Sequence, residues 1–238
     1  MRLFRIGPWA ILAVLLLSGG CARSPAPAHR GSPSSSPSAR GALAKPVNPA
    51  NIKRVGRELP PDDEVTSGVP SAASPRLAWR LPAGPSVVAA APPQCAILAD
   101  PGNGRDQAAQ GVSGSGAGGI VDAVVVSLPG APGPVALDRD VVAACGQWTM
   151  TAARTTVNVS LTDAPTIEDA DTLGMVADIR TSVESGTEID SRAYTFTAYL
   201  GEFYAFVTLT TDPGSAHPSL PPQFAADLLV KTVSAVRG

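Results

Sequence analysis

The segment YTFTAYLGEFYAFVTL, residues 194–209, limits the folds open to this chain more than any other segment. Gly201 and Glu202 at its centre are typical of a two-residue hairpin turn, in which glycine takes the first position because that position requires a positive φ angle. Folding the segment at this turn predicts four apolar pairs on one face: Leu200–Phe203, Ala198–Ala205, Phe196–Val207 and Tyr194–Leu209. Register and burial agree in this arrangement, so we predict an antiparallel hairpin with a buried inner face.

The opposite face of this hairpin carries three aromatic side chains among threonines. Tyr199, Tyr204 and Phe206 form a cluster in a chain that has only 5% aromatic residues. One interpretation is that another segment, such as residues 48–59, packs over them as core. The other is a partly exposed binding face, because tyrosine offers apolar area and a hydroxyl group together. We take these three residues as the candidate binding face.

Helices are predicted near both ends of the globular part, and shorter helices are predicted after Pro92-Pro93 and from Asp138, which is a typical capping residue. Asn48-Pro49 is a typical helix start, and Pro221-Pro222 precede a stretch whose apolar residues recur at helical spacing. Between them, residues 77–81, 120–128, 147–162 and 175–183 are interpreted as strands, and residues 147–162 need a bulge near 153–155 because their apolar positions change from even to odd. We therefore predict an α+β fold, an antiparallel β-sheet with the C-terminal helix packed on one face and one disulfide.

Residues 1–20 have the organisation of a secretory signal peptide. Two arginines form a basic start, and the apolar run over residues 6–17 is well short of the about 20 residues that a membrane-spanning helix needs. The small residues 18–20 followed by Cys21 resemble a bacterial lipobox, in which the cysteine is acylated and becomes the N-terminus. Ser18 stands where lipoboxes usually have leucine. Cleaved secretion without a lipid and an uncleaved anchor are the alternatives.

The other cysteines fit an exported chain. Of the three cysteines, removing Cys21 leaves Cys95 and Cys145, an even pair where disulfides persist, so we predict that these two are bonded. Residues 21–47 are rich in proline, serine and alanine and are expected to form a disordered linker after the lipidated cysteine. Residues 48–238 are then expected to form a single extracytoplasmic domain.

Charge and motifs exclude several classes of function. Residues 51–238 hold 12 basic and 20 acidic side chains, a net charge of −8 that argues against nucleic-acid binding. The Gly-rich run at residues 114–119 matches G-x-G-x-x-G, but a strand rather than a helix follows it, so a tight turn is expected and no cofactor. No metal-ligand cluster is expected, and the acidic residues Glu168, Asp169 and Asp171 are interpreted as a solvated loop.

Four segments resemble a known family. NIKRVGRELPPDDEV, PPQCAILADP, GSGAGGIVDAVVV and VVAACGQW are similar to segments of mycobacterial secreted lipoproteins that carry a domain of unknown function, number 5642. The resemblance covers roughly residues 48–238, and the paired cysteines are more distantly similar to the extracellular sensor domains of mycobacterial serine/threonine kinases. It implies a surface-exposed domain outside the membrane and no catalytic residues.

The expected function is therefore that of a non-catalytic cell-envelope lipoprotein. We expect a lipid anchor in the cell membrane, a location on its extracytoplasmic face, and binding of a small apolar ligand or an envelope protein. A structural or assembly factor of the envelope is one alternative. A serine hydrolase that uses His217 as its base is another, although neither G-x-S-x-G nor Ser-x-x-Lys occurs in the sequence.

Acylation of Cys21 can be tested directly. Cys21→Ser should release the protein into the medium and abolish its partitioning into detergent, because a serine cannot receive the lipid. Triton X-114 phase separation of cells that express each form measures this. Recovery of the wild-type protein in the aqueous phase would refute the lipoprotein prediction.

Overall fold

The computed structural model describes residues 45–82, 88–103, 105, 107–130 and 133–238. The expected signal peptide, the lipidated Cys21 and nearly all of the linker lie outside these residues. The strands are β1 (Glu64–Gly68), β2 (Ala89–Ala91), β3 (Ala108–Gly116), β4 (Gly119–Ser127), β5 (Gln147–Ala152), β6 (Thr155–Thr162), β7 (Asp171–Ser182), β8 (Glu188–Tyr199) and β9 (Phe203–Thr211). The helices are η1 (Pro49–Glu58), α1 (Pro75–Ala78), η2 (Pro93–Cys95), α2 (Ala96–Ala99), α3 (Arg139–Ala144) and α4 (Pro222–Arg237), where η marks a 3-10 helix.

In the described part of the chain, the strands form one nine-stranded sheet in the order β1-β3-β4-β9-β8-β7-β6-β5-β2. Each pair of neighbouring strands is antiparallel. The predicted antiparallel sheet, C-terminal helix and Cys95–Cys145 disulfide are confirmed. Five neighbouring pairs, β3–β4, β5–β6, β6–β7, β7–β8 and β8–β9, follow each other directly in the chain, whereas β1–β3, β2–β5 and β4–β9 are joined by longer stretches.

The hairpin of β8 and β9 has the predicted register. Phe196 pairs with Val207, Ala198 with Ala205 and Tyr194 with Leu209. Gly201 has a φ angle of +76°, as the first position of the turn requires. Alternation of side chains along the strands therefore sends these residues to one face of the sheet and Tyr199, Tyr204 and Phe206 to the other.

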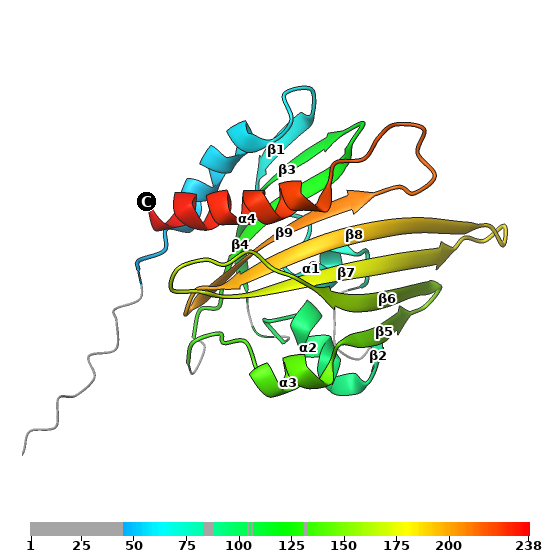
Figure 1. Cartoon of the computed structure of the whole chain (residues 1–238), viewed down its shortest axis with the longest axis horizontal. Coiled ribbons are helices and arrows are strands. Elements are labelled where there is room, and N and C mark those ends of the chain that lie inside the picture. The colour runs from blue at the N-terminus through cyan, green and yellow to red at the C-terminus, as the bar shows by residue number, and fades with distance from the viewer. Residues whose placement is uncertain (1–44, 83–87, 104, 106, 131–132) are drawn as a thin grey trace, which may run out of the picture. The chain divides into compact units, whose positions relative to one another are not determined.

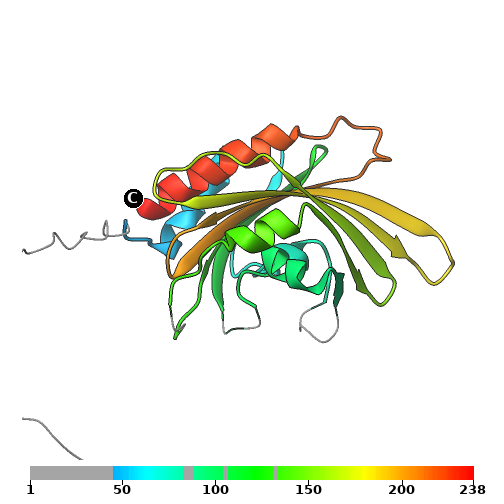
Figure 2. The ribbon, with the colours of Figure 1, turned by 60° about the horizontal axis from the view of Figure 1, so that its bottom comes forward.

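The first face of the sheet shares an apolar core with α4 and η1 (Figure 2). Leu229 and Val233 of α4 are buried in the same cluster as Phe196 and Val207. Each such side chain contributes about 1.5–3 kcal/mol of burial free energy. η1 begins as predicted, since the Asn48 side chain accepts a hydrogen bond from the Ala50 N–H, but it is a 3-10 helix. Residues 48–59 thus cover the first face, and not the aromatic residues of the second.

The second face is covered by the short helices α1, α2 and α3, on the side of the sheet away from α4 (Figure 2). Tyr204 and Phe206 are 0% exposed and Tyr199 is 7% exposed, all within a core cluster that also holds Trp79, Leu98 and both disulfide cysteines. The prediction of a partly exposed aromatic binding face is therefore wrong. A helix of four residues is too short for the spacing of its apolar residues to predict, from sequence, that it covers a sheet.

Two strand assignments also need correction. Residues 75–78 form α1 rather than a strand, because Pro75 suits the first helical position, and Trp79 after it is buried with its indole N–H donating to Thr195 Oγ1. Residues 147–162 are a hairpin rather than one bulged strand. A two-residue loop with Ala153 at a φ angle of +49° pairs Trp148 with Val159, which explains the change from even to odd apolar positions.

The Gly-rich run at residues 114–119 forms the end of β3, a two-residue turn at residues 117–118 and the first residue of β4, so the predicted tight turn is confirmed. Gly119 has a φ angle of +129°, and a Cβ atom there would lie 2.6 Å from the Thr210 carbonyl oxygen of β9. Both the backbone conformation and the close approach of the neighbouring strand therefore require glycine at this position.

Gly119→Ala should lower the free energy of unfolding by about 2 kcal/mol or more. The alanine would be strained by the positive φ angle, and its Cβ atom would clash with the Thr210 carbonyl oxygen. Gly146→Ala is the matched control, since a Cβ there meets nothing within 4 Å. Urea denaturation followed by far-UV circular dichroism measures both changes. Equal stability of Gly119→Ala and the wild-type protein would show that the turn tolerates a side chain.

Candidate functional site

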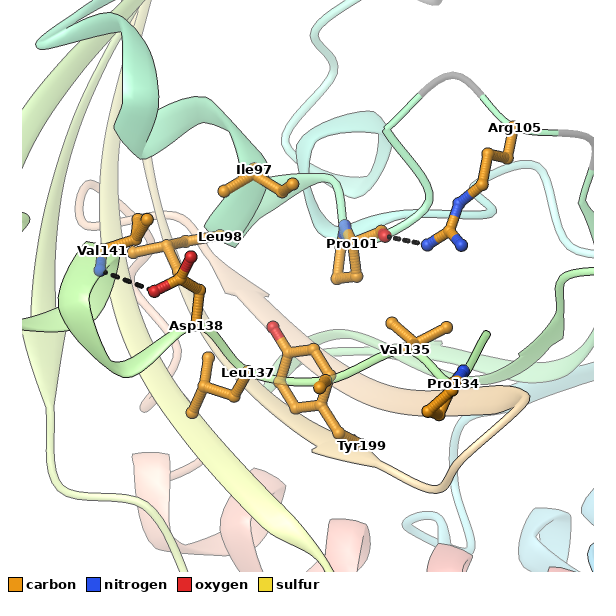
Figure 3. Close-up of a pocket in the computed structure, with 11 residues that line it drawn as sticks. Ile97, Leu98, Pro101, Arg105, Pro134, Val135, Leu137, Asp138, Val141 and Tyr199 are labelled. Carbon is orange, nitrogen blue, oxygen red and sulfur yellow. Dashed lines mark hydrogen bonds between the residues drawn. The ribbon is translucent and has the colours of Figure 1, made fainter. Parts of the chain in front are cut away.

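A pocket of about 460 Å³ opens on the second face, between α2, α3 and the end of β8 (Figure 3). We call it the α2–α3 pocket. Its walls are mainly aliphatic, with three polar side chains among them. The lining residues are Ile97, Leu98, Pro101, Arg105, Pro134, Val135, Ala136, Leu137, Asp138, Val141 and Tyr199.

The α2 wall follows from its sequence. Pro93 begins η2, as proline suits the first helical position. Cys95, Leu98 and Ala99 are buried in the core, whereas Ile97 is 38% exposed. The helix ends at Asp100, before Pro101, because the residue preceding proline disfavours the helical conformation. A single helical turn thus presents one buried and one half-exposed aliphatic side chain to the pocket.

The α3 wall is positioned by a cap and by a main-chain contact. The Asp138 Oδ1 atom accepts hydrogen bonds from the N–H groups of Asp140 and Val141, as the sequence predicts for a helix start (Figure 3). Before the helix, the Val135 N–H donates to the Gly201 carbonyl at 2.6 Å, which ties this segment to the β8–β9 turn. The wall is therefore anchored to the hairpin that forms the floor.

The disulfide joins the two walls. Cys95 directly precedes α2, Cys145 directly follows α3, and their Cα atoms are 5.6 Å apart. Both residues are fully buried in the core of the second face. Helices of four and six residues are not stable alone, so the covalent link and the core hold the pocket walls at a fixed separation.

Tyr199 forms the floor at the end of β8. Figure 3 shows its hydroxyl pointing into the space that α2, Pro101 and Asp138 surround. Burial, and then the negative charge of Asp171, raise the pKa of this phenol well above its usual value, so the group remains a neutral donor at physiological pH. Among the described residues, no hydrogen-bond partner satisfies this hydroxyl.

Arg105 stands at the other end of the pocket. Its Nε atom donates to the Gly102 carbonyl at 3.0 Å, and its Nη2 atom donates to the Pro101 carbonyl at 3.1 Å (Figure 3). These contacts hold the guanidinium group beside the pocket without a carboxylate partner among the residues that the structure describes.

A buried polar cluster adjoins the pocket. The Arg76 Nε atom donates to Asp100 Oδ2 at 3.0 Å, and both side chains are buried. Burial raises the pKa of the Asp100 carboxyl, and the Arg76 charge opposes that rise. The Tyr204 hydroxyl, opposite Tyr199 on the neighbouring strand, lies 2.8 Å from Gln107 Oε1. This cluster fixes the chain that leads from α2 to Arg105.

Sequence reasoning identified part of this site. It placed Cys95 and Cys145 together, and it named Tyr199, which does reach the pocket although not as an exposed surface. It did not find the aliphatic walls or Arg105, because nothing in their spacing shows that residues 97–105 and 134–141 are neighbours. The predicted disulfide was the one signal that could have brought these two segments together.

The other candidate groups lie elsewhere. His217 is in an exposed loop, where its backbone N–H donates to Ser215 Oγ. Glu168 and Asp169 are exposed and form ion pairs with Lys45. Among the described residues, no three histidine, cysteine, aspartate or glutamate side chains are grouped to hold a metal ion. None of the described helices is long and apolar enough to cross a membrane.

Comparison with known proteins identifies a family and a similar solved structure. Residues 48–237 match the family described as Domain of unknown function (DUF5642). No curated protein matches the chain. The X-ray structure of an uncharacterised protein from Mycobacterium smegmatis is similar, with a TM-score of 0.57 and 21% sequence identity over 81% of this chain and 98% of that one. At this identity the likeness shows a shared fold alone.

Replacing Cys95 and Cys145 together by alanine should lower the free energy of unfolding by about 4 kcal/mol in the chain-entropy model, because the bond closes a loop of about 50 residues. Thermal unfolding of the oxidised protein and the double variant measures this. Two free thiols in the unreduced, denatured wild-type protein would contradict the disulfide itself.

Proposed function

Because the chain belongs to the DUF5642 family, which has no assigned activity, we propose its function from the α2–α3 pocket and the N-terminal sequence. The protein is a lipid-anchored, extracytoplasmic binding domain that takes a small, largely apolar ligand in this pocket. The proposal joins two parts, a location outside the membrane and a binding site, and each has separate support.

The location is supported by the N-terminal sequence and the disulfide. A signal-like segment followed by Cys21 is expected to place the chain outside the membrane with a lipid on that cysteine. Disulfides persist in oxidising compartments and are rare in the cytosol of mesophiles, so the buried Cys95–Cys145 bond is consistent with export.

The pocket is the observation that carries the binding part. Its volume of about 460 Å³ falls within the range of about 300–1,000 Å³ that is typical of small-molecule sites. Such sites are mostly apolar with a few fixed polar groups, and here aliphatic walls surround Tyr199, Asp138 and Arg105. Among the described residues that line the pocket there is no serine, cysteine or histidine, and Asp138 is engaged as a helix cap, which favours binding over nucleophilic chemistry.

The disulfide adds a reason for tight binding. Walls that are held apart before the ligand arrives need no ordering when it binds, so less free energy is lost on association.

A neutral, fluorescent naphthylamine, N-phenyl-1-naphthylamine, is a suitable probe for the apolar pocket. Its fluorescence should rise on binding to the wild-type protein, and Ile97→Asp should weaken this binding at least about tenfold, because a carboxylate in an aliphatic wall disfavours an apolar ligand. Ile97 is 38% exposed, so the substitution should leave the fold intact.

Val230→Asp is the matched control. Val230 is 41% exposed on α4, which lies on the other side of the sheet, so this change adds the same charge away from the pocket. It should leave probe binding unchanged. Equal weakening by both substitutions, or no binding of the probe at all, would refute the proposed site.

A further inference from the structure

We infer that the α2–α3 pocket selects amphipathic carboxylates, with the carboxylate on the Arg105 guanidinium and the aliphatic chain against α2 and α3. This inference rests on the proposed function and names the ligand class of the same site. It follows from the charges and hydrogen-bond capacities that the pocket leaves unused.

The acidic side chains around the pocket already have partners within the protein. Asp138 accepts two backbone N–H groups at the start of α3. Asp171, which lies near Tyr199, forms an ion pair with Arg139. Asp100 is paired with Arg76. These three acidic groups therefore each have a partner that carries a positive charge or donates hydrogen bonds to them.

Arg105 differs from these groups. Its guanidinium group donates to two main-chain carbonyls, which orient it without neutralising its charge. Among the described residues it has no carboxylate partner. A guanidinium group presents several N–H donors in a planar fork that matches the two oxygens of a carboxylate, so an incoming carboxylate is the complementary ligand group.

The Tyr199 hydroxyl supplies a second unused donor. It points into the pocket and stays protonated, and no acceptor satisfies it among the described residues. The hydroxyl oxygen is open to the pocket space rather than enclosed, so a polar atom of a ligand can accept a hydrogen bond from it. Arg105 lies at the other end of the pocket, so a ligand whose carboxylate meets Arg105 can pass the Tyr199 hydroxyl as its chain reaches Ile97 and Val141 (Figure 3).

Decanoate, 1-decanol and decylammonium test this selection, because they share a chain and differ in the head group. Each is measured by displacement of N-phenyl-1-naphthylamine from the wild-type protein at low ionic strength. Decanoate should bind about tenfold or more tightly than 1-decanol, which is the range expected for a hydrogen bond to a charged group. Within the series hexanoate, octanoate and decanoate, each added methylene that is buried should tighten binding about fourfold.

Arg105→Gln should abolish the preference for decanoate over 1-decanol while leaving the affinity for 1-decanol unchanged. Arg57→Gln is the matched control, because it removes the same charge from η1, which packs on the first face. Tyr199→Phe keeps the ring in place and should leave the preference for decanoate over 1-decanol unchanged, because the carboxylate meets Arg105 and not this hydroxyl. The head-group comparison on the wild-type protein needs no variant, so the inference stays testable if Arg105→Gln does not fold.

The outcomes separate this inference from the proposed function. If 1-decanol and decanoate bind equally, or decylammonium binds most tightly, selection of carboxylates is wrong and an apolar binding site remains. If Arg57→Gln removes the preference as strongly as Arg105→Gln, the effect is one of overall charge and the assignment to Arg105 is wrong. If neither the probe nor any of the three amphiphiles binds, the proposed function fails together with the inference.

Discussion

Burial of the β8–β9 hairpin on both faces is the constraint on which the rest of this structure depends. Phe196 and Val207 face one side, and Tyr204 and Phe206 face the other, and all four are buried. A sheet that is apolar on both faces requires a covering layer on each. The C-terminal helix and η1 share a core with the first face, and three short helices cover the second (Figure 2). The two layers are built by different physical means.

The first layer is stable by ordinary packing, because α4 has sixteen residues and an apolar stripe. The second layer has helices of four to six residues, which cannot form by local propensity. A disulfide, a buried Arg76–Asp100 ion pair and the Trp79–Thr195 hydrogen bond hold this layer on the sheet. The α2–α3 pocket lies between these short elements.

The polar groups of the second layer divide into those that hold the layer and those that face the pocket. The buried pair of Arg76 and Asp100 is mutually compensated, so breaking it would leave an uncompensated buried charge and loosen the segment that carries Arg105. Arg105 and the Tyr199 hydroxyl retain free donor capacity at the pocket. This division supports the binding role that we propose for the pocket, in which the rigid polar cluster would fix the direction of the donors that a ligand meets.

Local sequence determined the hairpin of residues 194–209, the start of η1 at Asn48, the cap of α3 at Asp138 and the pairing of Cys95 with Cys145. Each of these depends on neighbouring residues, or on a count of cysteines, and needs no knowledge of distant contacts. Only the tertiary structure decided that Tyr204 and Phe206 are core rather than surface, because burial depends on what lies above a residue, and the covering helices come from segments more than 50 residues away. The pocket was decided in the same way, since Arg105, Val141 and Tyr199 become neighbours only when the sheet brings their segments together.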